Sequence, residues 1–146
     1  MTAHLVKMAV GIESFDHLAQ IQSDRMAQAG LQGGSGQLRH MTRNRPRRES
    51  DILDDGSIFW IIKGYIRARQ NIIGFREGVG RSGRARCAII LDPRLVRTVL
   101  TPHKPIQGWR YMEALAAPAD LGARELDVEI ALPENMADEL RTLGLL

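Results

Sequence analysis

Arginine accounts for most of the chemistry that this sequence offers. Seventeen of its twenty basic residues are arginine, and five of these fall within residues 39–48. A guanidinium group is planar and always charged, and it can pair with a phosphate through two parallel hydrogen bonds. Groups crowded in this way repel one another unless an anion lies nearby. The segment therefore predicts an anionic partner, and a phosphate backbone is the first hypothesis.

A second basic segment alternates as a strand would. Its odd-numbered residues are Lys63, Tyr65, Arg67 and Arg69. Side chains point alternately to the two faces of a β-strand, so these four would share one face over about 20 Å. A basic stripe with one aromatic ring can follow a sugar-phosphate backbone while a base stacks on the ring. The alternative is that the stripe is only the solvated face of a sheet.

These patterns predict a non-catalytic protein that binds RNA or a nucleotide, and they imply no cofactor and no metal. Tyr65 and Trp109 are the expected stacking residues, and polar side chains beside them would read a base edge. The residues that we expect to contact the ligand are Thr42, Arg43, Arg45, Arg47, Arg48, Lys63, Tyr65, Arg67, Arg69, Gln70, Gln107, Trp109 and Arg110.

The distribution of charge leaves a different reading open. The chain has 146 residues and a net charge of +3, but residues 1–36 carry −1, residues 37–112 carry +10 and residues 113–146 carry −6. The acidic end could neutralise the basic centre inside the fold or across a homodimer. In that case the protein is an interaction protein and needs no nucleic acid.

A small hydrolase that acts on a modified nucleoside is the catalytic alternative. Thr42 would be its nucleophile, and Lys63 or Glu77 would transfer protons. The other reactive side chains favour structural roles, since the four histidines lack the close helical pairing of a zinc site and are expected at the surface or in turns. Cys87 precedes an apolar run, which is typical of a buried structural thiol.

Residues 78–83 match the G-x-G-x-x-G pattern of dinucleotide-binding sites. That site needs a helix directly after the glycines and an acidic residue roughly 20 positions further on. Here a β-rich segment follows, and His103 stands where the acid should be. We therefore expect a hairpin loop, in which glycine supplies positive φ angles.

The elements that position these residues follow from apolar periodicity. Leu5–Val10 predicts a strand, and Ser14 would cap a helix that runs to about Ala29. Residues 32–37 read as a loop, and the arginine segment, interrupted by Pro46, as an edge strand or extended arm. Further strands are expected at 57–62, 65–75, 86–91 (ended by Asp92-Pro93), 107–112 and 126–132, with a last helix beginning at Pro133.

This order predicts a single α+β domain over residues 1–146, with a mostly antiparallel sheet that is open or curled into a small barrel, a helix in the N-terminal half and a C-terminal helix. The lone cysteine indicates a reducing compartment, so we expect a cytoplasmic protein. No segment approaches the roughly 20 apolar residues of a membrane helix.

Several short motifs together resemble an uncharacterised alphaproteobacterial family known only as a domain of unknown function. They are Thr42-Arg43, Pro46, Gly56-Ser57, Phe59-Trp60, Ile62-Lys63-Gly64, Arg69-Gln70 and Gln107-Gly108-Trp109-Arg110-Tyr111. The resemblance covers nearly the whole chain and implies a bacterial protein, but it carries no activity.

The order of Thr42-Arg43, Gly56 and an apolar strand also resembles the PUA-like superfamily and its ASCH branch. That resemblance implies a small β-barrel with peripheral helices that binds RNA or modified nucleosides. Some ASCH proteins are amidohydrolases with a lysine three residues before a threonine. Arg39 occupies that position here, and arginine does not readily release its proton to act as a base.

Overall fold

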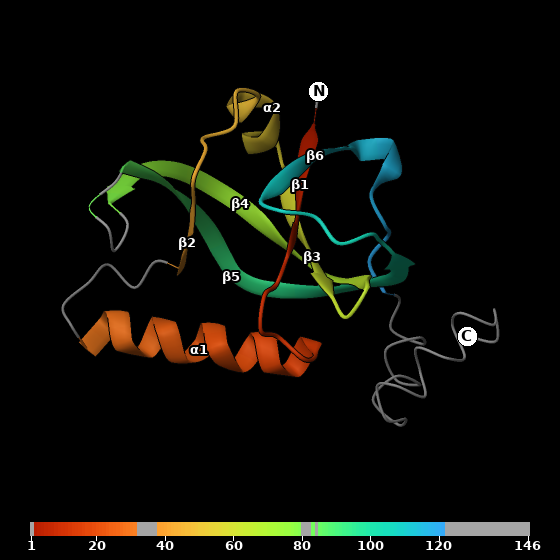
Figure 1. The fold of residues 1–146 in the computed structure, drawn as a ribbon, viewed down its shortest axis with the longest axis horizontal. Coiled ribbons are helices and arrows are strands. Elements are labelled where there is room, and N and C mark those ends of the chain that lie inside the picture. The colour runs from red at the N-terminus through yellow and green to blue at the C-terminus, as the bar shows by residue number, and fades with distance from the viewer. Residues whose placement is uncertain (1, 32–37, 80–82, 84, 122–146) are drawn as a thin grey trace.

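The computed structural model describes residues 2–31, 38–79, 83 and 85–121, which form one mixed six-stranded sheet with helices beside it (Figure 1). The strand order is β2-β5-β4-β3-β1-β6. The strands are β1 (Ala3–Met8), β2 (Leu38–Thr42), β3 (Ser57–Ile62), β4 (Tyr65–Val79), β5 (Ala85–Pro102) and β6 (Trp109–Glu113). The helices are α1 (Phe15–Leu31), α2 (Glu49–Leu53) and the 3-10 helix η1 (Ala114–Ala116).

The sheet confirms the predicted α+β class. Only β1 and β3 are parallel, and the chain between them passes through α1, β2 and α2. The other neighbouring strands pair antiparallel. The sheet is not closed, because β2 and β6 are its two edges. The open alternative is thus the observed one.

The centre of the molecule is β3, of which every residue is buried. Its even-numbered residues, such as Trp60, pack with α1 and α2 on one face of the sheet. Phe59 and Ile61 pack on the other face with Val6 and Met112. A strand covered on both faces is apolar throughout rather than alternating, which is why residues 57–62 were predicted with their observed bounds.

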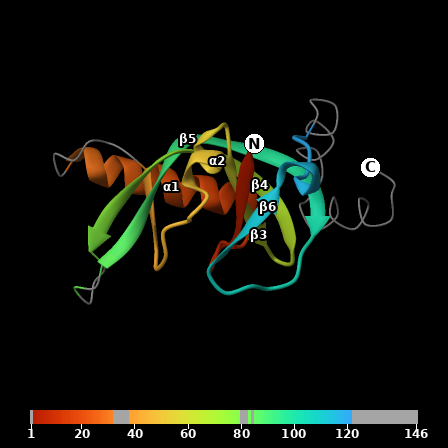
Figure 2. The ribbon, with the colours of Figure 1, turned by 90° about the horizontal axis from the view of Figure 1, so that it is seen from above.

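Helix α1 begins as predicted. The backbone N–H of His17 donates to Ser14 Oγ at 3.1 Å, which satisfies one free donor of the first turn. One side of the helix faces the sheet, where Leu18 and Gln22 are buried. In Figure 1 the helix runs along the lower side of the sheet, beneath β2 and β5, and Figure 2 shows the long β4–β5 hairpin reaching past the other strands.

The prediction that Asp92-Pro93 ends a strand is wrong, because β5 continues to Pro102. Ile72 pairs with Leu91 and Gln70 with Leu95, so residues 92–94 form a bulge opposite β4. Within it, the carbonyl of Asp92 accepts the Gln70 side-chain amide at 3.1 Å. Proline has no N–H to donate, and a bulge is where a strand tolerates it.

The arginine segment does lie at a sheet edge, but only its first part is a strand. β2 ends at Thr42, and α2, which the sequence did not predict, follows at Glu49. A turn at Asp54-Asp55-Gly56 leads into β3, with Asp55 at φ 62°. Gly56 has no room for a side chain, since a Cβ there would lie 2.3 Å from the carbonyl oxygens of Ala3 and Ile52.

Some predicted features lie outside the described residues. They are the loop at 32–37, the strand at 126–132 and the helix from Pro133. Of the Gly78–Gly83 pattern, Gly78 and Val79 belong to β4 and pair antiparallel with Arg86 and Ala85 of β5, as in a hairpin. Residues 80–82 lie outside the described residues. None of the helices in the described ranges is both long enough and apolar enough to cross a bilayer.

Candidate nucleic-acid interface

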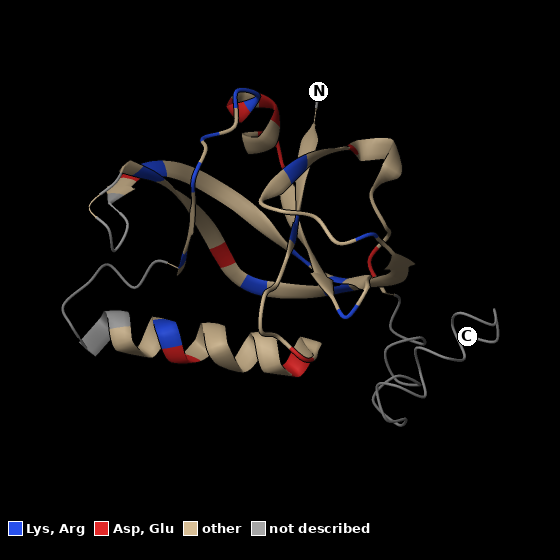
Figure 3. Cartoon of the chain, viewed as in Figure 1, with Lys and Arg blue, Asp and Glu red and all other residues tan. Residues whose placement is uncertain are grey.

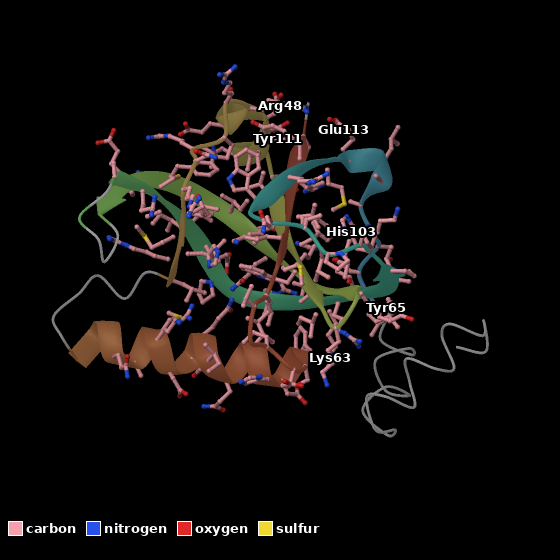
Figure 4. All side chains as sticks on the ribbon, viewed as in Figure 1. Arg48, Lys63, Tyr65, His103, Tyr111 and Glu113 are labelled. Atoms are coloured by element: carbon pink, nitrogen blue, oxygen red, sulfur yellow. The ribbon has the colours of Figure 1, made fainter. Side chains whose placement is uncertain are left out.

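The predicted contact residues separate into groups at different places on the sheet. Figure 4 shows Arg48, Tyr111 and Glu113 together at one side of the molecule, whereas Lys63 and Tyr65 lie at another. Tyr65 pairs with Pro102 at the end of β5, while Thr42 pairs with Cys87 near its start. The length of β5 therefore separates Tyr65 from Thr42.

The basic stripe predicted at Lys63, Tyr65, Arg67 and Arg69 is not a continuous face. Lys63 lies in the β3–β4 turn at φ 51° and forms an ion pair with Glu13 at 2.8 Å. The register of β4 shifts between Ile66 and Ala68, which interrupts the alternation at Arg67. Arg67 is only 6% exposed and donates to the carbonyl of Ile62 at 2.7 Å. Its guanidinium lies 5.4 Å from the centre of the Tyr65 ring.

Arg69 and Gln70 also make contacts within the protein. Arg69 Nη2 lies 2.7 Å from Asp120 Oδ2, and this hydrogen bond holds the pKa of Asp120 below its usual value. Gln70 is fully buried. Its side-chain oxygen accepts from the indole N–H of Trp60 at 3.1 Å and from the amide of Gln22 at 2.9 Å. The side-chain amide of Gln70 thus forms hydrogen bonds inside the protein and is not exposed at the surface.

The segment that follows β2 crosses to the opposite edge of the sheet and meets β6. The indole N–H of Trp109 donates to the carbonyl of Asn44 at 3.0 Å, and the backbone N–H of Arg48 donates to the Tyr111 hydroxyl at 3.2 Å. Arg48 Nη1 also lies 2.6 Å from Glu113 Oε1, and this hydrogen bond raises the pKa of Arg48. The rings of Trp109 and Tyr111 meet edge to face, with centroids 5.0 Å apart.

Four arginines from separate segments line one groove of ≈440 Å³ at the start of β5. Arg43 and Arg45 come from the segment after β2, whereas Arg76 and Arg86 come from the β4–β5 hairpin, and we call this site the basic groove. The segment after β2 and the β4–β5 hairpin, which carry these arginines, lie side by side in Figure 3. Glu77 is the one carboxylate among the described residues that line the groove.

Within the basic groove the arginines differ in their partners. Arg45 forms two hydrogen bonds with Glu49, at 2.9 and 2.8 Å, and these lower the pKa of Glu49. Arg43 and Arg86 have no ion-pair partner among the residues that the structure describes. These two guanidinium groups are therefore available to an anion.

The sequence predicted Arg43 and Arg45 as contacts. Arg86, beside the glycine pattern, was only a residue that could touch phosphate, and Arg76 was not predicted. Gly78 pairs with Arg86, and Glu77 pairs with Cys87. A prediction of this hairpin register would have shown that Arg76 and Arg86 lie beside each other. Arg47, Gln107 and Arg110 are exposed at other positions on the surface. Across the described ranges, no three His, Cys, Asp or Glu side chains are grouped so that they could share a metal ion.

A match to a family model covers nearly all of the chain. The model is described as "Protein of unknown function (DUF1489)" and matches residues 5–146. The chain belongs to the DUF1489 family. Comparisons with curated proteins and with solved structures gave no match. The basic groove of this DUF1489 chain lies wholly within the matched residues.

The residues of the catalytic alternative do not meet in this DUF1489 chain. Thr42 is buried, and its hydroxyl donates to the carbonyl of Asn44 at 3.1 Å. Glu77 lies across β5 from Thr42, because both pair with Cys87. Lys63 is at the other end of β5 and is paired with Glu13. Cys87 itself is buried as expected, and this burial raises the pKa of its thiol.

Proposed function

We propose that this protein binds single-stranded RNA, with the phosphates lying in the basic groove. The observation that carries the proposal is the convergence of four arginines on one concave site, namely Arg43, Arg45, Arg76 and Arg86. The described residues that line this site include one carboxylate. Arginine presents a fork of donors that matches a phosphate. Uncompensated positive charge in a groove attracts anions from a distance as well.

Some basic residues outside the basic groove form ion pairs with acidic residues. Arg48 is paired with Glu113, and Arg69 with Asp120. These two acids belong to the acidic end of the chain, so part of that end already neutralises the basic centre within one protomer. A homodimer is not needed for that pairing. The arginines of the groove that lack such partners are the better candidates for an external ligand.

A single strand suits this surface better than a duplex. Trp109 and Tyr111 contact the same segment that carries Arg43 and Arg45, and Tyr111 is 37% exposed. Bases of a single strand can stack on such rings, whereas the bases of a duplex are already stacked. The resemblance of Thr42-Arg43 and Gly56 to PUA-like proteins implies the same class of ligand. The lone cysteine agrees with a cytoplasmic location.

The test is a titration of fluorescently labelled single-stranded RNA at several salt concentrations. Four phosphate contacts predict that the logarithm of the affinity falls with the logarithm of the salt concentration with a slope of about −3. The double variant Arg43→Ala/Arg86→Ala should bind more weakly, with a slope of about −1.4. Lys104→Ala, which removes an exposed cation beyond the far end of β5, is the matched control and should bind as the wild type does.

Two outcomes would contradict the proposal. One is an absence of binding at low salt by protein whose circular dichroism shows that it is folded. The other is a double variant whose affinity and salt slope equal those of the wild type. Light scattering across the same salt series tests the homodimer alternative, because a dimer held by opposite charges should dissociate as salt rises.

A further inference from the structure

A second concave site lies under α1, away from the Arg43 and Arg86 side chains. It is a cavity of ≈210 Å³ between the helix, the free edge of β2 and the end of β1. The indole of Trp60 and the side chain of Leu91 line it from the sheet, and Gln22 lines it from α1. We call this site the α1 cavity.

His40, which lines the α1 cavity, carries a polar atom that has no hydrogen-bond partner among the described residues. His40 Nε2 is buried and, among the side chains that the structure describes, is the one buried nitrogen or oxygen without a hydrogen-bond partner. A buried donor left unpaired costs about 1–3 kcal/mol, so such an atom needs an explanation. A ligand in the cavity that His40 lines would supply the missing partner.

The charge of the α1 cavity indicates what that ligand is. Lys7, Arg25 and Arg39 line it, from β1, α1 and β2 respectively, and the described lining residues include no aspartate or glutamate. None of these three cations has an ion-pair partner in the described part of the chain. Burial, together with Lys7 and Arg25, lowers the pKa of His40 to about 4, so its ring is neutral at pH 7 and can donate one N–H.

The apolar side of the cavity is held in place by the interior amides. Gln70 joins Gln22 and Trp60 through hydrogen bonds of 2.7 to 3.1 Å, in which the Gln22 and Gln70 side chains pair reciprocally. The rings of His40 and Trp60 also meet edge to face, with centroids 5.0 Å apart. The positions of these groups are therefore set before any ligand arrives, which reduces the entropy cost of binding.

We propose that the α1 cavity binds a small molecule with one planar ring and one anionic group, a carboxylate or a phosphate. His40 Nε2 donates to the anionic oxygen, Lys7, Arg25 and Arg39 balance its charge, and the ring lies against Trp60 and Leu91. The volume equals that of about seven water molecules, at roughly 30 Å³ each. It thus accommodates a ring with a single substituent.

This site is separate from the basic groove and does not depend on RNA binding. Met41 lies between the two, because it lines the α1 cavity while its methyl group packs against Gly78 of the groove. The two sites thus use different charged residues. Variants of one leave the residues of the other unchanged, so the two proposals can fail independently.

Calorimetric titration with benzoate, phenyl phosphate and benzamide tests the proposal. We expect benzoate or phenyl phosphate to bind, and the stronger of the two identifies the preferred anion. Benzamide has the same ring without the charge and should bind at least about ten-fold more weakly, since hydrogen bonds to charged groups are the stronger ones. No saturable binding of either anion, or equal binding of benzamide, would overturn the proposal.

Variants connect the binding to the named residues. His40→Phe keeps a ring beside Trp60 but removes the donor, and it should weaken anion binding at least about ten-fold while RNA affinity is unchanged. Arg39→Ala alters an exposed side chain and should weaken anion binding several-fold. Arg94 is an exposed arginine outside the cavity, so Arg94→Ala should leave anion binding unchanged. In the imidazole NMR spectrum, bound anion should raise the pKa of His40. Unchanged binding in both His40→Phe and Arg39→Ala would refute the assignment.

Discussion

His40 should make the protein less stable in mild acid. In the folded chain, burial is the main cause that lowers the pKa of His40 to about 4, and the charges of Lys7 and Arg25 add to it. The unfolded residue has a pKa of about 6.5. Between these two values the unfolded state binds a proton that the folded state does not, so the free energy of unfolding falls as the pH falls.

The size of this effect follows from the two pKa values. Each pKa unit corresponds to about 1.4 kcal/mol, so the interval from 6.5 down to about 4 corresponds to about 3 kcal/mol. The stability contributed by neutral His40 is complete above pH 6.5 and is lost progressively down to pH 4. At pH 5, about 2 kcal/mol of it should already be lost.

Urea unfolding at pH 8 and pH 5 measures this loss in the wild type and in His40→Phe. The variant cannot titrate at this position, so its stability should fall by about 2 kcal/mol less than that of the wild type over the same interval. Burial also lowers the pKa of His4, but His4 is present in both proteins and cancels in the comparison. Equal losses in the two proteins would show that His40 is not held neutral by its surroundings.

Two further predictions concern the interior. Gly56→Ala should destabilise the fold by about 3 kcal/mol or more in urea unfolding, because the added Cβ would overlap the carbonyls of Ala3 and Ile52; a wild-type midpoint would contradict this. Gln70→Leu should cost about 2 to 4 kcal/mol, because the indole N–H of Trp60 loses its buried acceptor, and hydrogen exchange of that indole should quicken; an unchanged exchange rate would show that another group satisfies it.

Local patterns predicted the elements whose environment is uniform along their length. β3 is apolar because both its faces are covered, and α1 has a capping serine followed by a stripe that faces the sheet. The continuation of β5 past Pro93 could not be predicted in this way. It depends on a bulge whose hydrogen bonds come from Gln70, a residue on another strand.

The candidate sites were predicted less completely than the fold. His40 was expected at the surface or in a turn, yet it lies on β2 between Leu38 and Thr42, two residues whose side chains are buried. The alternation of Leu38, His40 and Thr42 with exposed Arg39 and Met41 was the signal that could have placed it. Arg67 was expected to contact phosphates from an exposed stripe, but the register shift beside it leaves its side chain buried in the protein.

The sequence alone determined the composition of the charged surface, the α+β class and the apolar centre, because these depend on residue type and on spacing within one segment. Among the described residues, the tertiary structure decided which arginines form ion pairs and which converge on a site without them. Arg48 and Arg69 meet carboxylates far along the chain, whereas Arg43, Arg76 and Arg86 converge on one groove. Whether a charge is neutralised depends on neighbours in space, and the pairing of strands brings those neighbours together.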